Sequence, residues 1–182
     1  PGAPPADYIA RSGGIFRDMT IHDFDMAMFL MGEMPNEVQA TGSVLTDSVI
    51  AELGDFDSAS VILKMPSGKQ VVISNSRRTS YGYDQRIEVH GSTGMIAAEN
   101  QRPVSIELAT AEGYLRPPLH DFFMTRYSDA YANELAHFIH HLTMGTKPRP
   151  NGQDGLNALV VADAAYQSAI SGQAVKPDST ND

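Results

Sequence analysis

The chain contains no cysteine, and this absence removes several kinds of chemistry at once. Without thiols the protein can form no disulfide bond, no thiolate metal site and no cysteine nucleophile. A chain without cysteine is compatible with a reducing compartment. We therefore expect a cytoplasmic protein whose stability comes from packing and polar contacts.

Positive charge and long apolar runs are also scarce. The chain has 13 Lys and Arg residues against 22 Asp and Glu residues, a formal net charge of −9. Such a balance argues against a phosphate backbone or an anionic membrane as the main partner. No stretch approaches the roughly 20 apolar residues of a membrane span, and the N-terminus lacks the pattern of a signal peptide. We expect neither a nucleic-acid nor a membrane partner.

The length predicts one domain. A chain of 182 residues that is 42% hydrophobic can bury one core but is short for two. Residues 1–12 start with several prolines, and we expect a loop there.

One helix is predicted from Gly13 to Met31, where Gly32 ends it. At about 100° per residue, Asp18, His22 and Asp25 fall in one narrow, otherwise apolar sector of this helix. Buried carboxylates and imidazoles need partners, so this set is a candidate site. The alternative is that Asp18 only favours the helix N-terminus and pairs with His22 across one turn.

Two sets of side chains have spacings that a metal ion could use. Asp18, His22 and Asp25 offer oxygen and nitrogen ligands, but three ligands from one helix face are geometrically awkward. The histidines within 137–141 have no carboxylate or cysteine set nearby and are more typical of a solvated or core-edge face. We predict no metal site.

Alternating and β-branched runs predict an antiparallel meander. The predicted strands are 37–41, 58–65, 70–76, 85–90, 95–98 and 104–108. The clean alternation from Arg86 to His90 indicates one buried and one wet face. The acidic segment 42–57 is predicted to be a weak strand and an exposed loop. Arg77 and Arg78 could receive a carboxylate or phosphate, but we expect them on the wet face.

Two further helices are predicted after the strands, over 121–144 and about 154–171. The last one is apolar on more than one side and needs cover beyond one sheet face. The predicted fold class is α+β: a mostly antiparallel, open-faced sheet with helices packed on one face. The free face suits a symmetric homo-oligomer, a dimer or a tetramer.

Two glycine-containing turns remain. Tyr81 and Tyr83 flank Gly82 where a strand ends, and their hydroxyls either point into a pocket or belong to ordinary aromatic packing. Gly91 to Gly94 lacks the pattern of a phosphate-binding loop and joins two strands, so it is predicted to be a plain turn.

The segment Gly13-Gly14-x3-Asp18-x3-His22-Asp23 resembles the C-terminal domain of the glucose-fructose oxidoreductase and inositol dehydrogenase family. The likeness continues in three further motifs: Tyr81-Gly-Tyr83-Asp followed by Glu88-Val-His-Gly-Ser-Thr-Gly, Arg126-Tyr-x3-Tyr131-x2-Glu134, and Asp154-Gly155-x2-Ala158. It is strongest to the inositol-oxidising members.

The resemblance implies a role for individual residues. His22 resembles the general base that takes the hydroxyl proton during oxidation of a secondary alcohol, and Asp18 resembles its partner carboxylate, which binds a substrate hydroxyl. Tyr83 matches a substrate-contacting tyrosine, and Tyr131 is expected to face the same pocket. Asp25 has no role in the family and is left as structural.

The resemblance also implies a missing half. Family members carry an N-terminal domain that binds NAD or NADP, and its glycine-rich loop and Glu-Lys-Pro lysine have no counterpart here. We expect residues 1–182 to be one C-terminal domain for substrate binding and oligomerisation, inactive alone, that acts on a polyol or sugar with NAD or NADP held mainly elsewhere. The alternative is a non-catalytic α+β module for dimerisation or small-ligand binding.

Overall fold

The computed structural model describes residues 2–178, and these form two compact units. The helix–sheet unit comprises residues 3–78 and 148–178, and the ribbon unit comprises residue 2 and residues 79–147. Each unit is described by itself. Of the predicted domain 1–182 and the predicted loop 1–12, residues 1 and 179–182 lie outside the described part.

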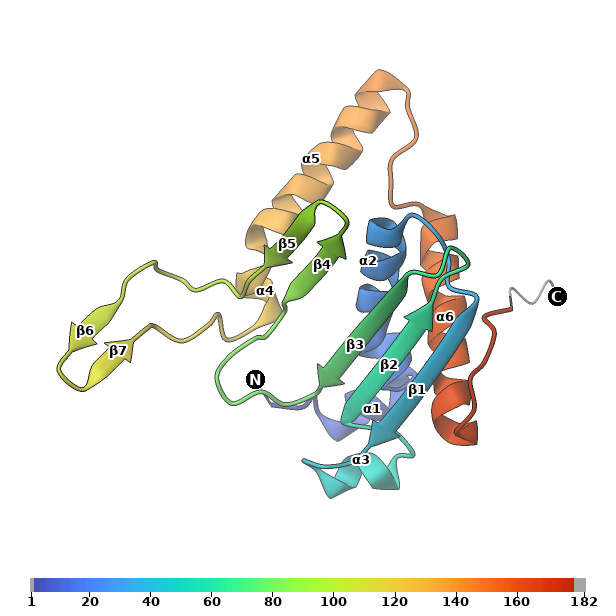
Figure 1. Cartoon of the computed structure of the whole chain (residues 1–182), viewed down its shortest axis with the longest axis horizontal. Helices are drawn as coiled ribbons and strands as arrows, with labels where there is room; N and C mark the ends of the chain where they lie inside the picture. Colours follow the sequence, from blue (N-terminus) through green and yellow to red (C-terminus); the bar gives the residue numbers. More distant parts are fainter. Residues whose placement is uncertain (1, 179–182) are drawn as a thin grey trace. The chain divides into compact units, whose positions relative to one another are not determined.

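The helix–sheet unit is built on a three-stranded antiparallel sheet (Figure 1). Its strands are β1 (Glu37–Ser43), β2 (Ser58–Lys64) and β3 (Gln70–Ser76), in that order. Side chains alternate along β2, where Val61 and Leu63 are buried while Ile62 between them is 46% exposed. This alternation confirms the predicted α+β fold with an antiparallel, open-faced sheet.

Helices cover one face of this sheet. The π-helix η1 (Phe16–Thr20) runs directly into α2 (Ile21–Met31), and α6 (Gly152–Ser171) packs on β1, α2 and η1. The sequence predicts that the last helix is buried on more than one side. Besides the sheet, α2 and η1 cover it. The core between these layers is formed by Ile15, Phe16, Phe24, Val38, Val61, Leu63, Met65, Val161 and Ala165, among others.

Two predicted loops contain helices. Residues 6–12 form α1 (Ala6–Ser12), because the prolines end at Pro5 and only restrict the entry to the helix. The supposedly exposed segment 42–57 contains α3 (Ser48–Glu52) and two buried acids, Asp55 and Asp57. Both acids are buried with hydrogen-bond partners, and this could not be seen from their local sequence.

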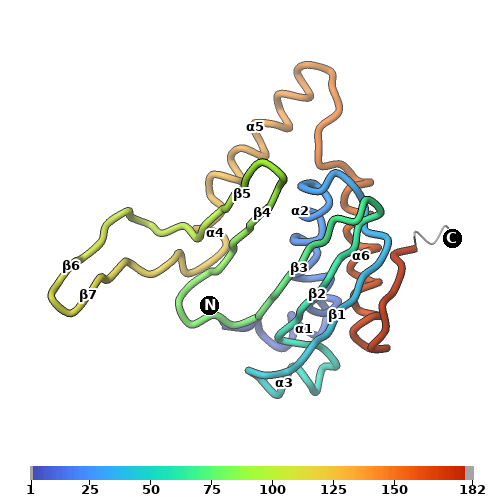
Figure 2. Tube along the Cα trace, viewed as in Figure 1, coloured from blue at the N-terminus to red at the C-terminus, as the bar shows by residue number. Residues whose placement is uncertain are grey.

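The ribbon unit contains two hairpins and two helices (Figure 2). These elements are β4 (Ile87–Gly91), β5 (Gly94–Ala98), β6 (Leu108–Thr110), β7 (Gly113–Leu115), α4 (Phe123–Arg126) and α5 (Ser128–Met144). Gly91 to Gly94 is the predicted turn, but the strand expected at 104–108 begins only at Leu108. The helix expected over 121–144 is interrupted at Tyr127.

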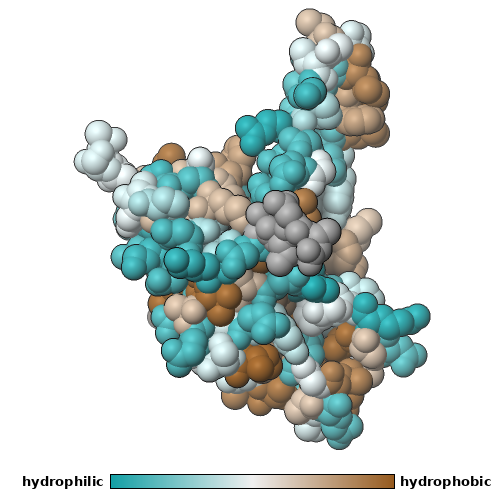
Figure 3. Space-filling model, turned by 90° about the vertical axis from the view of Figure 1, so that its right-hand side faces the viewer, coloured by the Kyte–Doolittle hydropathy of each residue, from teal (hydrophilic) through white to brown (hydrophobic). Residues whose placement is uncertain are grey.

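Apolar side chains remain exposed along α5, whose brown surface lies at the top of Figure 3. They include Leu135, Phe138, Ile139 and Leu142. No helix within residues 2–178 combines the length and the apolar character needed to cross a membrane.

Candidate functional site

The glycine pair of the motif makes a turn that no other residue pair would make easily. Gly13 ends α1, and both Gly13 and Gly14 have φ of 86°, in the left-handed region. A Cβ on Gly14 would lie 3.0 Å from Asp55 Oδ1. That oxygen accepts a hydrogen bond of 2.8 Å from the Ile15 amide, so the turn is fastened to the segment after α3.

The π-helix η1 follows at once and decides which side chains face the sheet. In a π-helix each backbone hydrogen bond joins residues five positions apart. The angular step per residue therefore differs from the 100° of an α-helix. Asp18 and Asp23, five positions apart, therefore both reach β3: Asp23 accepts from Asn75 at 2.9 Å, and Asp18 contacts Arg77 just beyond the strand. A helical wheel at 100° per residue therefore does not describe residues 16–20, which include Asp18, whereas His22 and Asp25 lie on the regular α-helix α2.

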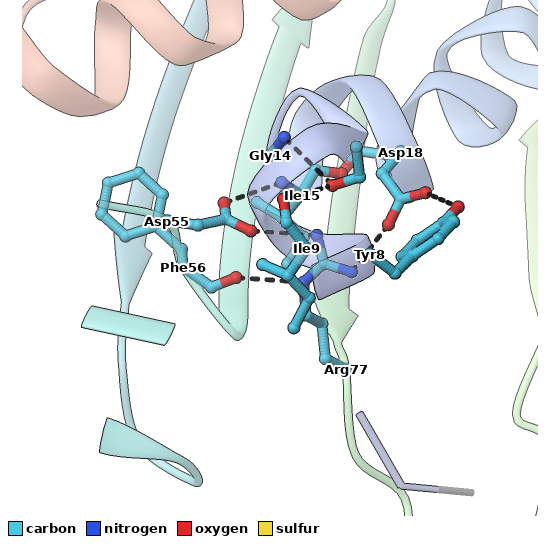
Figure 4. Close-up of polar contacts among 10 residues, drawn as sticks. Tyr8, Ile9, Gly14, Ile15, Asp18, Asp55, Phe56 and Arg77 are labelled. Carbon is cyan, nitrogen blue, oxygen red and sulfur yellow. Dashed lines mark hydrogen bonds and ion pairs between the residues drawn. The ribbon is translucent and has the colours of Figure 1, made fainter. Parts of the chain in front are cut away.

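Asp18 belongs to a buried ion network (Figure 4). Arg77 Nη1 lies 2.7 Å from Asp18 Oδ2, and Arg77 Nη2 lies 3.0 Å from Asp55 Oδ2. The Arg77 side chain has no exposed surface, and its Nε donates to the Phe56 carbonyl at 3.3 Å. A single guanidinium thus joins two carboxylates, which leaves a formal charge of −1 in the group.

The second oxygen of Asp18 is bound by Tyr8. The Tyr8 hydroxyl donates to Asp18 Oδ1 at 2.6 Å, and Tyr8 itself is 50% exposed. This hydrogen bond, with the negative charge of Asp18, raises the pKa of the Tyr8 phenol above its usual 10.0. Asp18 is therefore held from two sides, by a buried cation and by an exposed phenol.

His22 lies at the start of α2 and is exposed, whereas Asp25 is half-buried. Within the described residues, His22 forms no hydrogen bond with Asp18, whose oxygens are taken by Tyr8 and Arg77. The simple pair across one helical turn is thus not formed. What the structure brings together is a fixed carboxylate and, on the same short segment, an imidazole open to solvent.

The two predicted substrate tyrosines belong to the ribbon unit. The Tyr83 amide donates to the His120 carbonyl at 2.7 Å, and its ring meets Tyr127 edge-on with centroids 5.7 Å apart. Tyr131 lies one helical turn after Tyr127 on α5 and is 43% exposed. Tyr81 instead donates its hydroxyl to Asp84.

Sequence reasoning did not find Tyr8 and Asp55, and it placed Arg77 wrongly on the wet face. A signal existed for Arg77, because the inward alternation of β3 through Ile73 and Asn75 continues to position 77. The default expectation that arginine is exposed concealed it. Tyr8 and Asp55 carry no such local signal.

No group of three or more His, Asp or Glu residues that could hold a metal ion occurs within residues 2–178. The histidines of α5 contact one another: His137 Nε2 and His141 Nε2 lie 3.0 Å apart, and the His140 and His141 rings meet edge-on with centroids 5.6 Å apart. Arg77 already neutralises the carboxylates of the Asp18 site in part, and their remaining lone pairs can accept hydrogen bonds from donors such as hydroxyl groups.

Comparisons with known proteins find relatives that match the part of the chain containing the Asp18 network. Residues 1–97, which include the glycine turn and the whole Asp18 network, match the family described as GFO/IDH/MocA C-terminal domain. Inositol 2-dehydrogenase of Rhizobium meliloti (strain 1021) is 68% identical over 168 residues, 92% of this chain and 51% of that protein. The scyllo-inositol 2-dehydrogenase (NAD(+)) of Bacillus subtilis (strain 168) is 36% identical over 97% of this chain and 52% of its own length.

Solved structures of similar proteins have the same fold as this chain. The crystal structure of a myo-inositol dehydrogenase from Corynebacterium glutamicum ATCC 13032 superposes with a TM-score of 0.94 at 46% identity, covering 98% of this chain and 54% of the other. The chain thus spans about half the length of the relatives it matches. The matched segment, the likeness of fold and the sequence identities together show that the chain belongs to the GFO/IDH/MocA C-terminal domain family.

Proposed function

We propose that this chain is the substrate-binding half of an NAD- or NADP-dependent dehydrogenase that oxidises a secondary alcohol of a polyol, with myo-inositol as the substrate. One observation carries the proposal. In the segment that the family shares, Asp18 is fixed by a buried arginine while His22 stays exposed. Relatives that bear this segment are named inositol dehydrogenases.

The described residues do not fit a dinucleotide site. All paired strands within residues 2–178 are antiparallel, whereas dinucleotide-binding folds use parallel strands joined through helices. The cofactor, which accepts the hydride when bound, is therefore assigned mainly to a domain outside this chain. On this proposal the 182-residue chain alone binds no NAD and shows no turnover.

The chain's own residues handle the alcohol and its proton. His22 takes the hydroxyl proton, because imidazole is the side chain that most often serves as a general base near neutral pH. Asp18 accepts a hydrogen bond from a substrate hydroxyl, and its network, with one negative charge in excess, favours the imidazolium that forms. Tyr83 and Tyr131 are assigned to contacts with the ring.

The assembly is proposed to use the open face of the β1–β3 sheet. Ile62 is 46% and Val72 is 76% exposed on that face. Apolar side chains in neighbouring strands favour burial against a second copy. A homo-oligomer, a dimer or a tetramer, follows from this arrangement.

The test joins this chain to the N-terminal half of the Rhizobium meliloti relative, in place of the region it matches. NAD reduction with myo-inositol is then measured for the chimera and for its His22→Ala variant. Removal of a general base costs about 10²–10⁴ in kcat. Since His22 is exposed, the variant should keep the unfolding midpoint of the parent. A loss below about tenfold would exclude His22 as the base.

A further inference from the structure

The two oxygens of the Asp18 carboxylate have different surroundings. Oδ2 faces the Arg77 guanidinium, which has no exposed surface, and Oδ1 is bound by the half-exposed Tyr8. The Asp18 side chain retains 11% of its surface. Oδ1 is therefore the Asp18 oxygen that lies beside an exposed side chain, and it offers a route for a substrate hydroxyl.

Tyr8 and Asp18 can each still accept a hydrogen bond from a ligand. A tyrosine hydroxyl has one proton and two lone pairs, and Tyr8 uses its proton on Asp18. A carboxylate oxygen also accepts more than one hydrogen bond. Tyr8 Oη and Asp18 Oδ1 are thus two acceptors 2.6 Å apart at the solvent edge of the network. This spacing is similar to that of hydroxyl oxygens on neighbouring carbons of a saturated ring.

We propose that Tyr8 is a second substrate-contacting residue, and that Tyr8 and Asp18 together accept hydrogen bonds from two adjacent hydroxyls of a vicinal diol. This inference rests on the proposed function, which places a substrate hydroxyl on Asp18. It adds one substrate-contacting residue and explains why the substrate would be a polyol. A single alcohol donates a hydrogen bond to only one of the two acceptors, whereas a cyclic polyol donates to both.

Tyr8 is held in place for such a contact. Its neighbour Ile9 is 5% exposed and anchors α1 to the rest of the unit, and Gly13 ends that helix. Asp18 already has a buried cationic partner, so the Tyr8 hydroxyl is not needed to neutralise it. In Figure 4 the Tyr8 ring lies on the opposite side of Asp18 from Asp55.

The charge of the network selects against anions. Asp18 and Asp55 share one guanidinium, so a carboxylate or phosphate brought to Tyr8 meets an excess of negative charge. A neutral polyol supplies donors without that penalty. The proposal therefore predicts a preference for neutral polyols over sugar acids of similar size.

The first experiment checks the pair in the 182-residue chain. Tyrosine ionisation is followed by ultraviolet absorbance from pH 8 to pH 13 for the parent, Tyr8→Phe and, as a matched control, Tyr166→Phe, which removes a 40% exposed phenol from α6. The hydrogen bond to Asp18 raises the pKa of Tyr8, so Tyr8→Phe should remove a phenol that titrates above the usual value. Loss of an ordinary phenol instead would overturn the proposal.

The second experiment uses the chimera described above, with myo-inositol and a panel of monodeoxy analogues that each lack one hydroxyl. With myo-inositol, Tyr8→Phe should raise KM about 5- to 10-fold, as expected for one lost hydrogen bond, and Tyr166→Phe should not. With the analogue that lacks the hydroxyl bound by Tyr8, the effect should disappear. An equal loss across the panel would show that Tyr8 only supports Asp18, and an unchanged KM would show no contact; either result overturns the inference. The His22→Ala variant reports on the proposed function separately.

Discussion

The Arg77 guanidinium donates to the Asp18 carboxylate across 2.7 Å, although the two residues lie 59 positions apart in the chain. The contact ties the end of β3 to η1. The buried Arg77 side chain thereby fixes the orientation of the Asp18 carboxylate. The same guanidinium reaches Asp55, so three segments of the helix–sheet unit meet at one cation. Stability and the proposed chemistry therefore depend on the same side chain.

Replacing Arg77 by methionine should destabilise the helix–sheet unit strongly. The change leaves Asp18 and Asp55 buried without their cation, and breaking a buried pair in this way costs about 3–5 kcal/mol. Urea unfolding of the 182-residue chain measures the loss. The matched control is Arg78→Met, an exposed neighbour that should stay within about 0.5 kcal/mol of the parent. Equal effects of the two substitutions would contradict the network.

Gly14→Ala should destabilise the chain more than Gly54→Ala. Both glycines have positive φ, at 86° and 69°, so alanine is strained at each by about 1–2 kcal/mol. Only at Gly14 does the added Cβ meet another atom, Asp55 Oδ1 at 3.0 Å, whereas Gly54 has open space. The difference between the two free energies of unfolding isolates that contact. If both variants lost the same stability, the close approach of Asp55 would have no energetic consequence.

Asp57 should make the stability depend on pH in the acid range. Burial raises the pKa of this carboxyl, but hydrogen bonds from the Leu45 and Thr46 amides and the Ser58 and Thr46 hydroxyls outweigh burial and bring it far below its usual value. A lowered pKa in the folded state gives stability that is complete above the unfolded value near 3.8 and is lost as pH falls below it.

Asp57→Asn should therefore cost about 2–4 kcal/mol at pH 7, and its deficit should shrink as the pH falls from about 4 to 2. Unfolding by urea at a series of pH values measures both. Asp7→Asn on the exposed side of α1 is the control and should leave the pH profile unchanged. A deficit that stays constant down to pH 2 would assign the Asp57 contribution to packing instead of charge.

The sequence was sufficient where local pattern decides the structure. The alternation of β2 and the stop of α2 at Gly32 follow from side chains within a few residues of each other, and both are confirmed. The order of the helices and strands after residue 37 was also largely predicted. What local pattern cannot give is a partner that lies far away in the chain.

The candidate site shows this difference clearly. Asp18 and His22 were singled out from the motif, but Arg77, which holds Asp18, was expected on the wet face. Its two carboxylate partners lie 59 and 22 positions away, so nothing near Arg77 indicates that its charge is compensated. The π turn is a second reason, because a helical wheel drawn at 100° per residue does not place Asp18 and Asp23 on one side.

Ser168→Ala should loosen the packing of α6 on β1. The Ser168 hydroxyl accepts from the Ala40 amide at 2.9 Å and donates to the Gln173 carbonyl at 2.6 Å, and the residue has no exposed surface. Alanine removes no large apolar group but leaves a buried amide and carbonyl without this partner, which costs about 1–3 kcal/mol. Ser171→Ala is the matched control, because that serine is exposed and bonds only within its own helix and its C-terminal turn. Amide exchange at Ala40 gives a local readout: Ser168→Ala should speed it well beyond the effect of Ser171→Ala. If exchange at Ala40 were equally slow in both variants, the Ser168 hydroxyl would not be what protects this amide, and Ser168 would not link α6 to the sheet.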